Sequence, residues 1–218
     1  MVVILNFKTY DESLGIEALR CARSAYEFSL HSKNKIIICP QTVDLENVIQ
    51  HYPQSDNFEI WSQHVDYQQG GANTGFLTLE TLKKIGVRGS LINHAEHKIS
   101  DIYKYNKIDD EINLCLCAAD LLELKLDVQK NTEFTPKYIA YEPPSLIGGN
   151  VSVSQSHGDD IESIVDNFPS YDILVGAGVK TKKDVEMAIK YGAKGILIAS
   201  GFVYAVDKSD FLQKLLEY

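Results

Sequence analysis

The chain has 218 residues, of which 44% are hydrophobic and 23% charged, and its formal net charge is −9. This composition supports a hydrophobic core and excludes a disordered chain, and the length suits one large α/β domain or two small ones. The acidic charge argues against general nucleic-acid binding, which needs a basic face, although a local basic site could still bind an anionic substrate.

Three further features of the sequence predict a cytoplasmic protein that does not bind membranes. No run reaches the roughly 18 apolar residues of a membrane span. The apolar run at residues 2–7 lacks the basic segment and cleavage site of a signal peptide. The sequence also offers no second Cys or His pair at zinc spacing, so we expect reduced, packed thiols and no metal. The cysteines are Cys21, Cys39, Cys115 and Cys117.

Short β-favouring runs alternate along the chain with longer segments whose apolar residues recur at helical spacing. The expected strands are residues 2–7, 35–39, 59–63, 87–92, 112–117, 137–141, 172–175 and 195–199. The clearest helical patterns are residues 15–30, 119–129, 182–191 and 208–217. Alternation of strands and helices predicts parallel pairing.

Eight such units predict a (β/α)8 TIM barrel, with residues 1–218 forming a single domain. An open, doubly wound sheet is the main alternative. The first turn of such a sheet would carry a glycine-rich dinucleotide-binding pattern, but residues 6–10 read NFKTY.

In such barrels the working face is the C-terminal end of the strands. The first strand ends in Asn6-Phe7-Lys8, and Asn6 and Lys8 share one face. A lysine pointing into the barrel mouth favours an anion there; a solvated lysine just past the strand is the alternative. The third strand leads into a long, polar, glycine-rich loop at residues 63–75, and a loop of this kind indicates an interface.

The fourth strand runs into His94, and helical patterning begins around Ala95. The positive end of a helix dipole would disfavour protonation of this histidine. A neutral imidazole can act as an electrophile or a proton shuttle at physiological pH. A histidine that only caps the helix is the alternative.

The sixth strand ends at Glu142, which is followed by Pro143-Pro144 and then by Gly148-Gly149. The prolines end the strand, and the glycines can act as a hinge or bring backbone N–H groups close to an anion. This pattern predicts a carboxylate base covered by a lid at residues 143–149. A strand-end glutamate on an ordinary turn is the alternative.

Small residues follow the seventh and eighth strands, at 176–179 and 199–201. They leave backbone N–H groups accessible, and helix starts add partial positive charge. A phosphate site at the ends of strands 7 and 8 recurs in (β/α)8 barrels, so we expect one at this place.

Taken in order, these landmarks resemble the triosephosphate isomerase family, and in particular its short archaeal-type branch, over the whole length. The motifs that carry the resemblance are NFK at 6–8, GANTG at 71–75, NHAEHK at 93–98 and AYEPPSLIGG at 140–149. The resemblance implies Glu142 as the base, His94 and Lys8 as electrophiles, and Glu96 as support for the site. The implied substrate contacts are Asn6, Lys8, Ile147, Gly148, Gly178, Ala199 and Ser200.

The implied reaction interconverts dihydroxyacetone phosphate and D-glyceraldehyde 3-phosphate through an enediolate, in glycolysis and gluconeogenesis, with no metal or organic cofactor. The resemblance also implies a homodimer or homotetramer joined through the loop around Thr74.

Several residues depart from the family pattern, among them Ala95, Pro144 and the Ala199-Ser200 pair. These departures bear on lid packing and subunit contacts more than on chemistry. Two other functions stay open: an aldolase with Lys8 as a Schiff-base nucleophile, and a non-catalytic metabolite-binding barrel.

Overall fold

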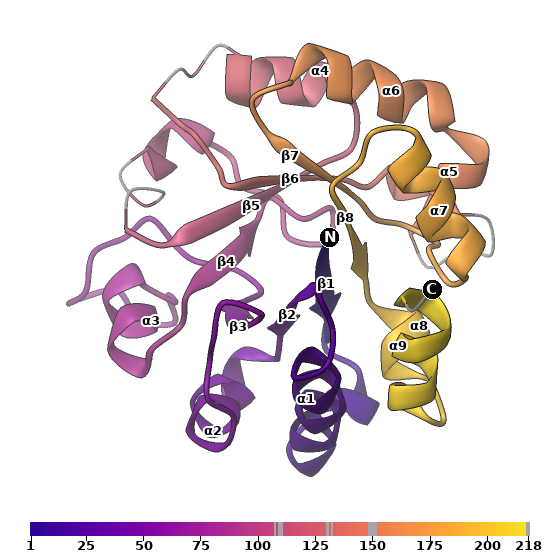
Figure 1. The fold of residues 1–218 in the computed structure, drawn as a ribbon. Helices are drawn as coiled ribbons and strands as arrows, with labels where there is room; N and C mark the ends of the chain where they lie inside the picture. Colours follow the sequence, from indigo (N-terminus) through magenta and orange to yellow (C-terminus); the bar gives the residue numbers. More distant parts are fainter. Residues whose placement is uncertain (107, 109–110, 130, 132, 148–151, 217–218) are drawn as a thin grey trace.

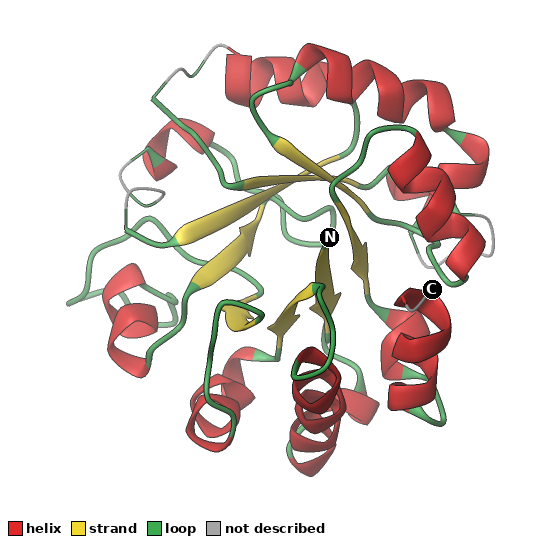
Figure 2. Cartoon of the chain, viewed as in Figure 1, coloured by secondary structure: helices red, strands yellow, loops and turns green. Residues whose placement is uncertain are grey.

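The computed structural model describes residues 1–106, 108, 111–129, 131, 133–147 and 152–216. Within this part of the chain, eight parallel strands follow one another around a closed barrel, and β1 pairs with both β2 and β8. Helices surround the strands (Figures 1 and 2). The predicted (β/α)8 fold is confirmed.

The strand boundaries agree with the sequence prediction to within two residues. The strands are β1 (Val2–Asn6), β2 (Lys35–Cys39), β3 (Phe58–Ser62), β4 (Gly89–Ile92), β5 (Asn113–Ala118), β6 (Tyr138–Tyr141), β7 (Asp172–Val175) and β8 (Gly195–Ile198). Only β2 and β7 have the predicted ends. Propensity alone does not decide where pairing with a neighbouring strand stops.

The predicted helices at 15–30 and 182–191 are confirmed to within a residue, and the one at 208–217 is confirmed up to the last described residue. The helices are α1 (Ile16–Ser29), α2 (Leu45–His51), α3 (Leu79–Ile85), α4 (Leu121–Leu124), α5 (Val153–Ser156), α6 (Gly158–Asn167), α7 (Lys182–Lys190), α8 (Ser200–Val203) and α9 (Lys208–Leu216). Shorter 3₁₀ turns are η1 (Asp11–Ser13), η2 (Thr42–Asp44), η3 (Ile102–Tyr105) and η5 (Pro144–Leu146). The predicted helix at 119–129 is α4 followed by a π-helical turn, η4 (Lys125–Gln129).

One helix prediction is wrong. In residues 93–106, all of which the structure describes, no helix begins near Ala95, and the next helical turn after β4 is η3. Asn93 adopts a left-handed backbone conformation with φ 57°, and its side-chain Oδ1 accepts a hydrogen bond from the backbone N–H of Ile99. This local hydrogen bond closes a loop, and Asn side chains are well suited to compete with helix formation in this way.

Buried side chains form two layers because successive residues of each strand point to opposite faces. Ile4 and Ile37 belong to an inner cluster, whereas their neighbours Leu5 and Ile38 belong to the outer core. The ring of Trp61 on β3 stacks with that of Tyr138 on β6 at 5.8 Å between centroids, a contact that crosses the barrel interior. Both strand faces are therefore buried, as the continuous apolar runs predicted.

The cysteines are packed as the sequence predicted. All four are free and buried. Cys115 and Cys117 both face the barrel interior, as expected from their spacing of two on one strand. Among the described residues, no helix has the length and apolar character needed to cross a bilayer.

Candidate active site

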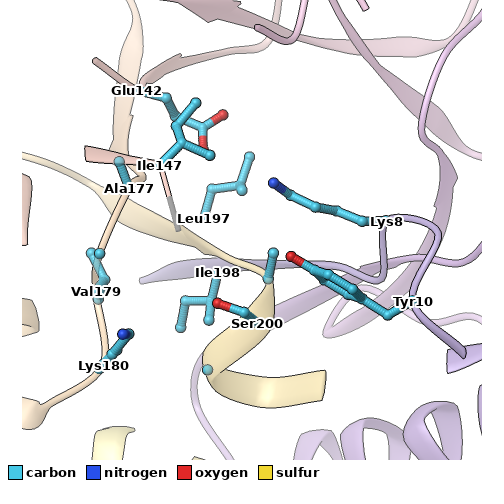
Figure 3. Close-up of a pocket in the computed structure, with 13 residues that line it drawn as sticks. Lys8, Tyr10, Glu142, Ile147, Ala177, Val179, Lys180, Leu197, Ile198 and Ser200 are labelled. Carbon is cyan, nitrogen blue, oxygen red and sulfur yellow. The ribbon is translucent and has the colours of Figure 1, made fainter. Parts of the chain in front are cut away.

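Three chemically active side chains meet at the C-terminal mouth of the barrel although they come from distant parts of the chain. Lys8 follows β1, His94 follows β4 and Glu142 follows β6. His94 Nε2 lies 3.5 Å from Glu142 Oε2, and Lys8 Nζ lies 2.6 Å from Glu96 Oε1. Figure 3 shows the Lys8 and Glu142 side chains pointing into one pocket.

Lys8 is held in a strained conformation. Its φ is 48°, in the left-handed region that costs a non-glycine residue about 1–3 kcal/mol. The side chain of Asn6 accepts a hydrogen bond from the Lys8 backbone N–H at 3.0 Å, and Gln63 Nε2 donates to the Lys8 carbonyl at 2.9 Å. Only 12% of the Lys8 side chain is exposed, so it is not the solvated lysine of the alternative interpretation. The surrounding hydrogen bonds aim the ammonium group into the mouth.

The imidazole of His94 is buried and neutral. Its Nδ1 accepts a hydrogen bond from the backbone N–H of Glu96 at 3.2 Å, which leaves the ring proton on Nε2, facing Glu142. Burial and, next, the positive charge of Lys8 lower the pKa of His94 to about 4. The prediction that protonation of His94 is disfavoured is confirmed, but the predicted cause, a helix beginning at Ala95, is wrong.

The carboxyl group of Glu142 is buried directly above the inner core. Burial raises its pKa to about 7, against the opposing effects of the Lys8 charge and a hydrogen bond with Cys117. Within the described part of the chain, Glu142 Oε2 and His94 Nε2 are buried without a hydrogen-bond partner. Buried polar atoms that lack partners are rare, and two that lie 3.5 Å apart beside a pocket indicate a place for a polar ligand.

Gly176, which directly follows β7, leaves room for the Glu142 side chain. A Cβ atom on this residue would lie 2.5 Å from both Cγ and Oε1 of Glu142. Any side chain at this position would therefore displace the carboxylate. The sequence prediction treated Gly176 only as part of an anion site, because the contact with Glu142 comes from a different strand.

A pocket at the ends of β7 and β8 adjoins these side chains. Its lining residues are Lys8, Tyr10, Glu142, Ile147, Ala177, Gly178, Val179, Lys180, Leu197, Ile198, Ala199, Ser200 and Gly201. Four of the predicted substrate contacts, Ile147, Gly178, Ala199 and Ser200, thus share it with Lys8. Gly148 lies outside the described residues. The short helix α8 begins at Ser200, which lines the pocket, and the first backbone N–H groups of a helix have no partner within it.

The remaining predicted residues, Asn6 and Glu96, line an adjoining groove of about 590 Å³ together with His94. The sequence prediction missed Gln63 and Tyr10 as site residues. The sequence prediction places Gln63 at the end of the third strand and the start of the interface loop, and it uses Tyr10 only to show the absence of a glycine-rich pattern. No local pattern signals either role, because both depend on neighbours that are distant in sequence.

Comparison with known proteins agrees with this geometry. A family model described as "Triosephosphate isomerase" matches residues 1–216. The chain is 33% identical to the triosephosphate isomerase of Methanothermus fervidus, over 99% of this chain and 97% of that one. It is 31% identical to that of Methanocaldococcus jannaschii over both full lengths, and 35% identical to that of Thermoplasma volcanium over 99% of each. The similarity is global, and it includes every strand that contributes to the barrel mouth, so the chain belongs to the triosephosphate isomerase family and is an isomerase.

Proposed function

We propose that this protein interconverts dihydroxyacetone phosphate and D-glyceraldehyde 3-phosphate, with Glu142 as the base and His94 and Lys8 as electrophiles. The observation that supports these roles best is the pair of buried, unpartnered atoms, Glu142 Oε2 and His94 Nε2, 3.5 Å apart at the barrel mouth. In a complex with substrate, Glu142 Oε2 would contact the substrate carbon that loses its proton, and His94 Nε2 would donate a hydrogen bond to the neighbouring carbonyl oxygen.

In the proposed reaction, Glu142 removes a proton from the carbon next to the carbonyl group. The developing negative charge falls on the carbonyl oxygen, which accepts hydrogen bonds from His94 Nε2–H and the Lys8 ammonium. Glu142 then returns the proton to the neighbouring carbon, while the oxygens exchange a proton, so the enediolate collapses to the isomeric carbonyl compound. A carboxyl pKa of about 7 suits this exchange, because a base is most effective when its pKa lies near the working pH.

The phosphate group would lie in the pocket at the ends of β7 and β8. Backbone N–H groups around Gly178, Ala199 and Ser200 line it on one side, and Lys8 supplies charge from the other. Glu96 holds the Lys8 ammonium through their 2.6 Å ion pair. We assign the segment 143–149 as a lid that excludes water, a role supported by Ile147 at the pocket edge; Gly148 and Gly149 lie outside the described residues.

A coupled assay of isomerisation in both directions tests this function. We expect the purified protein to form either triose phosphate from the other without added metal or cofactor. Reduction with borohydride in the presence of substrate should leave Lys8 unmodified, because no Schiff base forms. Trapping of a Lys8 adduct would support the aldolase, and absence of turnover in either direction would support the non-catalytic barrel.

The pH dependence of the reaction should follow the ionisation of Glu142. The base must be deprotonated, and burial raises its pKa to about 7, so kcat/KM should rise from pH 5 to about pH 7 and then level off. His94, whose pKa is lowered to about 4, stays neutral over this pH range and so adds no second inflection to the plot of kcat/KM against pH. The plot of kcat/KM against pH should be corrected for ionisation of the substrate phosphate, whose second pKa is about 6. A corrected profile that is flat from pH 5 to 8 would contradict the assignment.

We also propose that the loop at 63–75 joins subunits, with Thr74 inserted beside the active site of a neighbouring copy. Thr74 is exposed, and the groove next to Lys8 and His94 has a volume of about 590 Å³ in which a segment of a neighbouring copy would lie. Sedimentation equilibrium should therefore give the mass of a dimer or tetramer. A monomer at micromolar concentration would exclude this arrangement.

A further inference from the structure

Tyr10 lies where the two cavities of the barrel mouth meet. It lines the pocket that contains Glu142, Gly178 and Ser200, and also the groove that contains His94. Lys8 is the other residue common to both cavities in the described part of the chain. The placement of Tyr10 therefore resembles that of a residue already assigned to substrate binding.

The Tyr10 ring is held in place before any ligand arrives. Its centroid lies 4.9 Å from that of Tyr204, which caps the C-terminus of α8, and the two rings are tilted by 52°. The Tyr10 carbonyl accepts hydrogen bonds from Gln41 Nε2 and from the backbone N–H of Ser13, both at 3.0 Å. A ring that packs on a neighbouring ring and has an anchored backbone loses less entropy when its hydroxyl binds a ligand.

The Tyr10 hydroxyl is directed into the cavity. Figure 3 shows Tyr10 and Lys8 entering from one wall, with Ala177 and Val179 on the wall opposite. Among the described residues no hydrogen bond to this hydroxyl is found, although its ring and backbone are well anchored. A phenol carries one O–H donor, so this hydroxyl can donate a hydrogen bond to an acceptor placed in the pocket.

On the side of the pocket formed by Lys8 and Tyr10, a neutral hydrogen-bond donor would add to the charge of Lys8. The Lys8 charge is shared with Glu96 through their 2.6 Å ion pair. The opposite wall, at Ala177 and Val179, offers mainly backbone N–H groups such as that of Gly178. A phosphate dianion has three strong acceptor oxygens, so a donor on the Tyr10 side adds to the hydrogen bonds that the opposite wall can give.

We propose that the Tyr10 hydroxyl donates a hydrogen bond to the phosphate group of the substrate and so contributes to selection of a phosphorylated triose. The inference rests on the proposed function, since it assigns the phosphate to the pocket beside β7 and β8. It adds to that function a phosphate contact from the wall opposite Ala177 and Val179.

The test is Tyr10→Phe, which removes the hydroxyl and keeps the ring on Tyr204. We expect KM for glyceraldehyde 3-phosphate to rise by about 10- to 100-fold, the range for a hydrogen bond to a charged group, with kcat nearly unchanged. The dissociation constants of 2-phosphoglycolate and inorganic phosphate should rise by a similar factor. For D-glyceraldehyde, which has no phosphate, kcat/KM should stay at the wild-type value.

Tyr204→Phe is the matched control, because it removes a hydroxyl from the other ring of the same pair. It should leave all these constants at the wild-type values, and thermal melting should show both variants folded. Unchanged phosphate binding in Tyr10→Phe, or an equal loss with glyceraldehyde, would overturn the inference and leave the proposed function intact. Failure of the wild type to isomerise triose phosphates would instead refute the function, while phosphate binding by the two proteins would still decide the role of Tyr10.

Discussion

Replacing Glu142 with Gln is expected to lower kcat by about 10⁴-fold, the upper end of the range for removal of a general base. The amide has nearly the shape of the carboxylate and fits the space that Gly176 leaves, but it cannot accept the substrate proton. At pH values above 7, the thermal midpoint of the variant should equal or exceed that of the wild type. The change removes a buried carboxylate whose ionisation is disfavoured in the folded state.

Two comparison variants complete this experiment. Glu142→Asp withdraws the carboxylate by roughly 1 Å and should cost about 10²-fold in kcat, because proton transfer depends steeply on position. Glu162→Gln makes the same chemical change at an exposed position on α6 and should leave the kinetics at the wild-type level. Near-normal turnover by Glu142→Gln would remove Glu142 from its role.

Replacing Lys8 with Ala should reduce kcat/KM by at least about 10³-fold, because one change removes a donor to the enediolate and a charge that binds phosphate. Loss of the ammonium also leaves Glu96 without its 2.6 Å partner and removes an effect that lowers the pKa of Glu142. The corrected pH profile should therefore move to higher pH in this variant. Isothermal titration with 2-phosphoglycolate should detect no binding at concentrations that saturate the wild type.

Lys194→Ala is the control for the change in net charge. Lys194 directly precedes β8, at the N-terminal end of the strands and so at the opposite end of the barrel. It should bind 2-phosphoglycolate as the wild type does. If Lys8→Ala also binds the analogue with unchanged affinity, the anion site does not lie beside Lys8.

The positions of the candidate site residues along the chain were predictable because a parallel barrel brings all strand ends to one face. Lys8, His94 and Glu142 each follow a predicted strand by no more than two residues, so their meeting required only the right count of strands. The hydrogen bonds that align them were not predictable. Gln63 reaches the Lys8 carbonyl from another strand, and nothing in the local sequence around either residue signals this contact.

The sequence by itself determined the alternation of strands and helices, the burial of both strand faces and the order in which candidate residues reach the barrel mouth. These properties depend on local propensity and on the spacing of apolar residues, which are read directly from the chain. The tertiary structure alone decided that His94 is neutral through burial beside Lys8, that a loop replaces the helix expected at Ala95, and that Gly176 leaves room for Glu142. Desolvation and steric exclusion depend on which distant segments pack together, so no stretch of sequence contains them on its own.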